Sequence, residues 1–81
     1  MSGPSEAMES MAERLEAIAE ELSDMALDAL RRAGMGDPDS AETGEALAEE
    51  RRLLKARRAV ERSVVALRQR SRSAAFDDGA A

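Results

Sequence analysis

The sequence predicts an all-α fold, a long antiparallel helical hairpin that dimerises into a four-helix bundle. Large apolar residues recur at alternating steps of three and four along residues 8–25, and alanines recur every seven residues beside them. This is the pattern of a helix packed lengthwise against another helix. The composition points the same way, because Ala, Leu, Glu and Arg dominate and only one residue is aromatic. A cluster of Gly, Asp and Pro near the middle of the chain divides the pattern into two helices.

The first predicted helix covers about residues 5–33. Ser5 is placed to cap its N-terminus, and Gly34 is placed to end it in a left-handed conformation. Small side chains every seven residues allow a close approach of the partner helix, namely Ala12, Ala19, Ala26 and Ala33. Beside them runs the predicted seam of large apolar residues, which consists of Met8, Met11, Leu15, Ile18, Leu22, Met25 and Leu30.

The second predicted helix covers about residues 42–71, with Asp39 or Thr43 as alternative caps. The large residues of its seam are Leu53, Val60, Val64 and Leu67. The predicted connection of six to eight residues is short, and short connections join antiparallel neighbours. Residues 1–72 are therefore expected to form one helical domain, and the aperiodic residues 73–81 a disordered tail.

Charge is divided unevenly between the two halves and supports the hairpin. Residues 1–46 carry twelve acidic and three basic residues, net −9, whereas residues 47–81 carry five acidic and nine basic residues, net +4. An acidic row on the first helix would face a basic row on the second. If the chain folds about residue 37 or 38, the level pairs are Glu13 with Arg62, Glu16 and Glu20 with Arg58 and Lys55, and Asp24 with Arg51.

Two helices alone cannot cover both flanks of their seams, which is why a dimer is expected. Leu27, Leu54 and Val65 lie off the main seams and need a second surface. The alternative is a monomeric hairpin of marginal stability that is completed by a different protein partner.

The residue types exclude several kinds of chemistry. The chain has no Cys and no His, which removes thiolate and imidazole metal sites as well as Cys- or His-based catalysis. Di-metal sites in helical bundles combine Glu with Glu-x-x-His pairs, and that pattern is missing. Glu49 and Glu50 are the acids nearest the inner face of the second helix, and neither is expected to have a matched partner. We therefore predict no catalytic, cofactor-binding or metal-binding residues, no small-molecule substrate and no enzyme activity.

The chain is expected to work in the cytoplasm. Its N-terminal residues lack the basic and apolar segments of a signal peptide, and the apolar run at residues 64–67 is too short for a bilayer. No membrane partner is predicted. Abundant Ala and the choice of Arg over Lys in eleven of twelve basic residues are typical of GC-rich bacterial genomes.

Two functions remain open at this point. The first is a non-enzymatic protein–protein interaction module, an adaptor, regulator or assembly subunit, which recognises a helix or a second copy through its seam. The second is a nucleic-acid-associated regulator that contacts phosphates through the basic second helix. The residues expected to make phosphate or acidic-partner contacts are Arg51, Arg52, Lys55, Arg57, Arg58 and Arg62.

Overall fold

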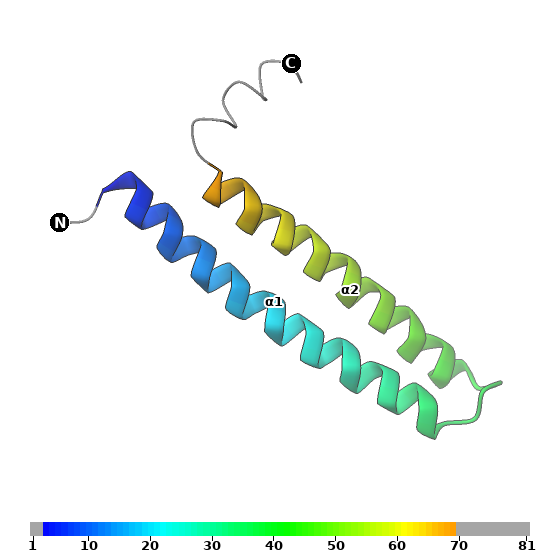
Figure 1. The fold of residues 1–81 in the computed structure, drawn as a ribbon. Coiled ribbons are helices and arrows are strands. Elements are labelled where there is room, and N and C mark those ends of the chain that lie inside the picture. Colours follow the sequence, from blue (N-terminus) through cyan, green and yellow to red (C-terminus); the bar gives the residue numbers. More distant parts are fainter. Residues whose placement is uncertain (1–2, 70–81) are drawn as a thin grey trace, which may run out of the picture.

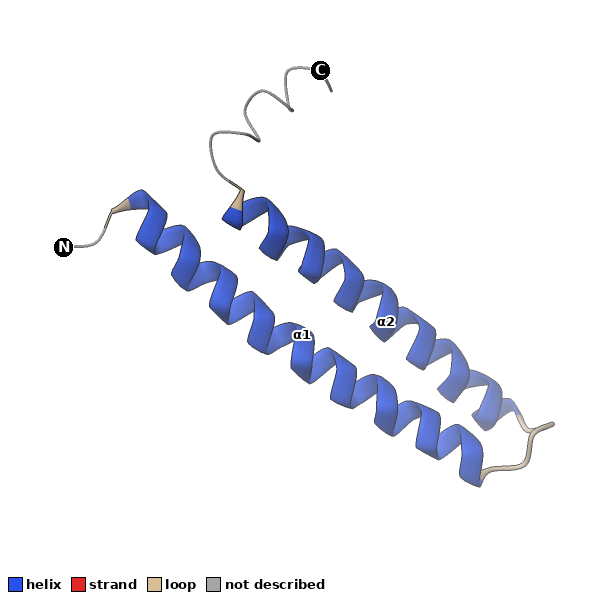
Figure 2. Ribbon diagram, in the orientation of Figure 1, coloured by secondary structure: helices blue, strands red, loops and turns tan. Residues whose placement is uncertain are grey.

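The structure is a computed structural model and describes residues 3–69. Two helices, α1 (Pro4–Met35) and α2 (Ala41–Arg68), lie side by side and run in opposite directions (Figure 1). Helices and short loops account for all of residues 3–69, which contain no strand (Figure 2). The predicted all-α hairpin is confirmed. The predicted tail, residues 73–81, lies outside the described residues.

The start of α1 differs from the prediction. Pro4 is the first helical residue, where its fixed φ suits the helix and its missing N–H costs no hydrogen bond. Gly3 is the N-cap and makes no side-chain cap hydrogen bond. Ser5 therefore lies inside the helix, and its predicted role as the cap is wrong.

The end of α1 also lies further along the chain than expected. Gly34 is part of the helix, which continues to Met35, and no glycine among residues 3–69 has a positive φ. The C-cap is Gly36, whose N–H donates to the carbonyl oxygen of Ala33 at 3.4 Å. The left-handed ending predicted at Gly34 is therefore wrong.

The connection between the helices consists of the five residues 36–40, and Ser40 ends it as the N-cap of α2. The Ser40 hydroxyl accepts a hydrogen bond from the Thr43 N–H at 3.1 Å and donates one to the Thr43 hydroxyl at 3.0 Å. The carboxylate of Asp37 accepts from the N–H of Asp39 at 3.0 Å within the turn. Neither Asp39 nor Thr43 is the cap, because Ser40 already satisfies the first free N–H groups of α2.

The far end of α2 lies three residues before the predicted end at Ser71. Arg68 is its last helical residue and Gln69 is the C-cap, whose N–H donates to the carbonyl oxygen of Val65 at 3.0 Å. Ser71 itself is outside the described residues.

The core of the hairpin is built from small side chains. We call Ala12, Ala19, Ala26 and Ala33 the alanine row, and all four are buried, together with Ala29. On α2 the buried residues are Thr43, Ala46 and Val64. No large side chain among residues 3–69 is fully buried. The two helices therefore meet along the alanine row, because small side chains allow the closest contact between helix surfaces.

Apart from Val64, which is buried, the predicted large apolar seam lies toward the edges of this contact. Leu15 and Leu22 are half-buried, and so are most seam residues of α2, namely Leu53, Val60 and Leu67. The remaining large seam residues of α1 keep 43–51% of their surface exposed, namely Met8, Met11, Ile18, Met25 and Leu30. Leu27 and Val65, predicted to lie off the seams, are exposed as well.

Candidate interaction surfaces

Two rows of α1 residues flank the contact with α2, one on each side. Residues seven apart lie on the same face of a packed helix. One flanking row contains Glu9, Glu16 and Ser23, and the other contains Met11, Ile18, Met25 and Arg32. Contacts with α2 distinguish the two sides of the hairpin, because Arg57 and Arg68 reach the first row and Glu49 reaches the second. We call them the ion-pair face and the methionine face.

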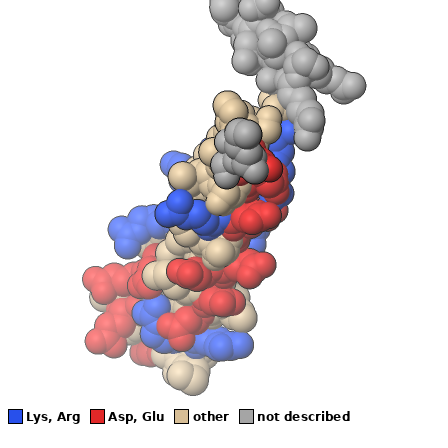
Figure 3. Space-filling view, turned by 90° about the vertical axis from the view of Figure 1, so that its left-hand side faces the viewer, with Lys and Arg blue, Asp and Glu red and all other residues tan. Residues whose placement is uncertain are grey.

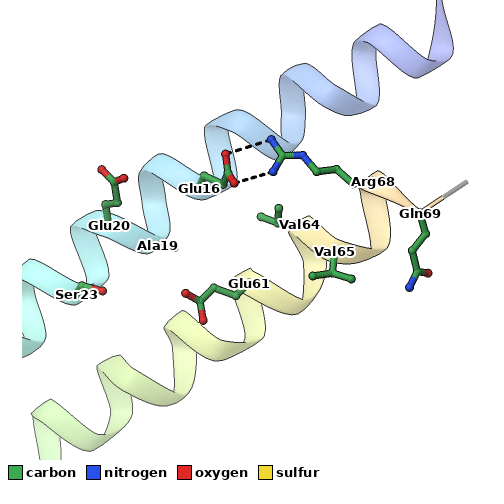
Figure 4. A pocket seen from close by; sticks show the side chains of 9 residues that line it. All are labelled: Glu16, Ala19, Glu20, Ser23, Glu61, Val64, Val65, Arg68 and Gln69. Atoms are coloured by element: carbon green, nitrogen blue, oxygen red, sulfur yellow. Dashed lines mark hydrogen bonds and ion pairs between the residues drawn. The ribbon is translucent and has the colours of Figure 1, made fainter.

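Arg68 holds the open end of the ion-pair face together. Its guanidinium donates to the carboxylate of Glu9 at 2.6 Å and to that of Glu16 at 2.7 Å. Figure 4 shows the paired bonds to Glu16 across the two helices. The hydrogen bonds that Arg68 donates to Glu9 and, to a smaller extent, to Glu16 raise the pKa of Arg68, so the side chain stays positively charged. This contact joins the beginning of α1 to the end of α2.

A groove of about 760 Å³ opens between the helices next to this ion pair (Figure 4). Ala19 and Val64 lie between the helices, and Glu20 and Glu61 come from opposite sides. The other lining residues are Glu16, Ser23, Val65, Arg68 and Gln69. Residues 3–69 contain no group of three or more acidic residues able to hold a metal ion. The groove therefore combines an apolar floor with charged walls.

Arg57 reaches inward on the same face. Its Nη1 donates to the hydroxyl of Ser23 at 3.1 Å, and its Nε lies 3.8 Å from a carboxylate oxygen of Glu61. That Nε is buried and has no hydrogen-bond partner within the described part of the chain. Arg57 was predicted to contact a phosphate or an acidic partner, but the structure turns it toward α1.

Within residues 3–69, the ion pairs of the methionine face are formed by Arg32, at the end nearest the connection. Arg32 donates to the carboxylate of Glu49 at 2.8 Å and to that of Asp28 at 3.1 Å. Glu49 and then Asp28 raise the pKa of Arg32 through these hydrogen bonds. Glu49, expected near the inner face of the second helix without a matched acid for a metal site, thus pairs with a cation of α1.

The Arg32–Glu49 contact fixes which residues lie opposite one another on the methionine face. One heptad from this pair, Met25 lies across from Ala56, and two heptads away Ile18 lies across from Ser63. Ala56 and Ser63 are exposed. The methionine face therefore has large apolar side chains on α1 and a shelf of small side chains on α2.

The ion pairs between the helices are not the predicted ones. Within residues 3–69, Glu13 does not pair with Arg62, and Asp24 does not pair with Arg51. Glu16 and Glu20 likewise form no ion pair with Arg58 or Lys55. Side chains lean toward the N-terminus of their own helix, so contacts between antiparallel helices are displaced from the level of the backbones. Each observed ion pair between the helices therefore joins a residue of α1 to one further along α2 than the level position: Glu16, for example, pairs with Arg68 and not with Arg58.

The basic side chains on the outer surface of α2 remain available. The exposed basic residues of α2 that form no ion pair with any other described residue are Arg51, Arg52, Lys55, Arg58 and Arg62. A side view of the hairpin shows acidic and basic side chains interspersed along one face (Figure 3). Within residues 3–69, none of these five side chains lies within ion-pair distance of a carboxylate.

Sequence reasoning missed three features of these faces. The roles of Ser23 and Arg68 were not predicted. The sequence pattern assigned Ala56 and Ser63 to the seam of the second helix, whereas the structure leaves both exposed, where they form a small-residue shelf. The sevenfold spacing of Glu9, Glu16 and Ser23 was a signal for a polar flank, but it does not reveal which cation reaches it.

Comparisons with protein-family models, with curated proteins and with solved structures find no match for this chain. In the part of the chain that the structure describes, neither helix has the length and apolarity needed to cross a membrane.

Proposed function

We propose that the protein is a non-enzymatic interaction module of the cytoplasm, which associates with a helical surface through its methionine face. In this proposal the hairpin forms a homodimeric four-helix bundle, and the bundle serves as an adaptor, regulator or assembly subunit. One observation carries the proposal: Met11, Ile18 and Met25 form a continuous row that stays about half exposed. Burying a side chain of this size contributes about 1.5–3 kcal/mol relative to full exposure.

The composition of the core also supports this proposal. The hairpin buries alanines and leaves its larger apolar side chains at the edges of the contact. Helical bundles are usually completed by more than two helices, whose facing sides cover one another. A second hairpin on the methionine face would complete the burial that α1 and α2 begin. Burial of one apolar helix face against another is the corresponding recognition mode.

The test is to place a charge in the centre of the methionine face. We expect Ile18→Asp to abolish association, because a carboxylate would have to lose its hydration in an apolar contact. Ala17→Asp is the matched control, since Ala17 is the exposed neighbour on the outer side of α1. Light scattering coupled to size exclusion measures the mass, and circular dichroism verifies that both variants stay helical. A dimer mass for Ile18→Asp would contradict the proposal.

A second function is favoured by the free basic surface of α2. Its five exposed basic residues could contact phosphates or an acidic protein surface. In that case a labelled DNA duplex should bind at low salt and dissociate steeply as NaCl increases. Replacement of Arg51 and Arg58 by Gln should reduce this salt dependence, whereas replacement of the inward-facing Arg57 should change it less. Electrostatic binding to phosphates is strongest at low salt. The absence of DNA binding at about 20–50 mM NaCl would therefore exclude this function.

A further inference from the structure

We infer that the second copy docks with its two-fold axis parallel to the helices, so that α1 of each copy lies on α2 of the other. Met11, Ile18 and Met25 of one copy then pack on the small-residue shelf of the other copy. This inference depends on the proposed function and specifies the geometry of the same surface. Shape and charge support it independently of each other.

The shape of the methionine face is complementary to itself in this arrangement. Met25 and Ile18 project from α1, while Ala56 and Ser63 leave a low strip on α2 at the same levels. Rotation about a two-fold axis parallel to the helices leaves the position of each residue along the helix axis unchanged. It brings α1 of one copy opposite α2 of the other. Met25 therefore meets Ala56 of the second copy, and Ile18 meets Ser63 of the second copy. Large side chains packed against small ones give the interdigitation that helix packing needs.

The charges of the helices favour the same arrangement. α1 carries eight acidic and three basic residues, net −5, whereas α2 carries five acidic and seven basic residues, net +2. With α1 on α2 of the partner, each helix has neighbours of opposite charge in both copies. Complementary charges along helix flanks determine which helices pair and in which orientation.

The alternative two-fold axis lies across the helices and places α1 on α1. It would bring two helices of net −5 together, and like charges at close range repel. It would also place the projecting row of one copy against the projecting row of the other, centred on Ile18. The shelf of α2 would then face the shelf of the second copy and leave a gap between small side chains. This alternative is therefore disfavoured by both shape and charge.

Engineered cysteines distinguish the two arrangements, because the chain has no native thiol. One preparation carries Met25→Cys and a second carries Ala56→Cys, and the two are mixed in equal amounts under mild oxidation. A disulfide needs Cβ atoms about 3.5–4.5 Å apart, so it reports direct contact. We expect a heterodisulfide between the two variants well above the share that random pairing gives. Ile18→Cys mixed with Ser63→Cys should give the same result one heptad away.

The control is Ile18→Cys alone, which should form little homodisulfide, because the two α1 helices are diagonal in the inferred dimer. A dominant homodisulfide of this variant, with heterodisulfides at the random share in the mixtures, would overturn the inference and leave the proposed dimer intact. A monomer mass for the reduced, helical variants and for the unmodified protein would instead overturn the proposed dimer. Light scattering on the same samples separates these two failures.

Discussion

Ala26 shows how a single small residue sets the distance between the helices. It lies in the middle of the alanine row and is 3% exposed. Its neighbour Met25 is much larger, yet it remains half exposed at the edge of the contact. The sequence contains the same sevenfold repeat for alanines and for large residues, and the smaller set occupies the centre. Residue size, and not hydrophobicity alone, therefore decides which row faces α2.

We predict that Ala26→Leu destabilises the hairpin by about 1–3 kcal/mol, because the added carbons have no space between the helices. Ala17→Leu makes the same change on the exposed side of α1 and should alter the free energy of unfolding by less than about 0.5 kcal/mol. Urea unfolding followed by circular dichroism measures both. Equal effects of the two variants would show that the alanine row is not the centre of the contact.

Arg68 offers a prediction about pH. Hydrogen bonds with Glu9 and Glu16 raise its pKa, so its stabilising effect is present below the ordinary arginine pKa and is lost only at still higher pH. A lysine in its place has an ordinary pKa of about 10.4 and loses its charge earlier. The melting temperature of Arg68→Lys should therefore fall further below that of the unmodified protein as the pH rises from about 8 to about 11.

The control for this experiment is Arg62→Lys, because Arg62 is exposed and forms no ion pair within residues 3–69. Its difference in melting temperature should stay constant over the same pH range. A constant difference for Arg68→Lys as well would show that the contact with Glu9 and Glu16 does not contribute to stability.

At the scale of the helices, Gly34 and Gly36 should respond in opposite ways to the same substitution. A Cβ at Gly34 would meet nothing within 4 Å, and this residue is helical. Gly34→Ala should therefore stabilise the protein by about 0.5–1 kcal/mol. A Cβ at Gly36 would lie 2.7 Å from the hydroxyl oxygen of Thr43, which Ser40 holds in place.

Gly36→Ala should consequently destabilise the protein by about 1–3 kcal/mol through this steric conflict. Thermal and urea unfolding at one fixed protein concentration compare the two variants. Stabilisation by both substitutions would mean that the connection adapts to the added methyl group without disturbing the cap of α2.

The helices were largely predictable from the sequence, whereas their ends were not. Periodicity identified both helices and the break between them. Gly34 was read as a stop signal, although a single glycine in a helix costs only about 1 kcal/mol and does not by itself end the helix. Ser5 was read as a cap, although Pro4 already starts the helix one residue earlier. Local signals of about 1 kcal/mol do not fix a boundary to the residue.

The candidate site was predictable in part for a related reason. The sequence identified Met11, Ile18 and Met25 as part of one apolar seam, and the structure places these three residues at the edge of the contact. The ion pairs on each flank depend on how α2 is aligned against α1. The apolar pattern of the sequence alone does not determine this alignment. Arg57 looked like the other basic residues of α2, but its position in the heptad turns it inward toward Ser23.

At the scale of the whole molecule, stability should depend on protein concentration. If the hairpin dimerises as proposed, association stabilises the folded state by mass action, and the melting temperature should rise with concentration. The Ile18→Asp variant should melt at a temperature that does not change with concentration. An unmodified protein that melts at the same temperature over a hundredfold range of concentration, roughly the range accessible to circular dichroism, would contradict association through the methionine face.

The alanine row also has a consequence for alignment. Its side chains are identical and evenly spaced, so sliding α1 along α2 by one heptad, about 10 Å, would still place an alanine at three of the four positions. The packing at the centre of the hairpin would therefore be nearly the same before and after such a shift. The contacts that favour one alignment lie at the two ends of the hairpin. They are the five-residue connection with the nearby Arg32–Glu49 pair, and the ion pairs of Arg68.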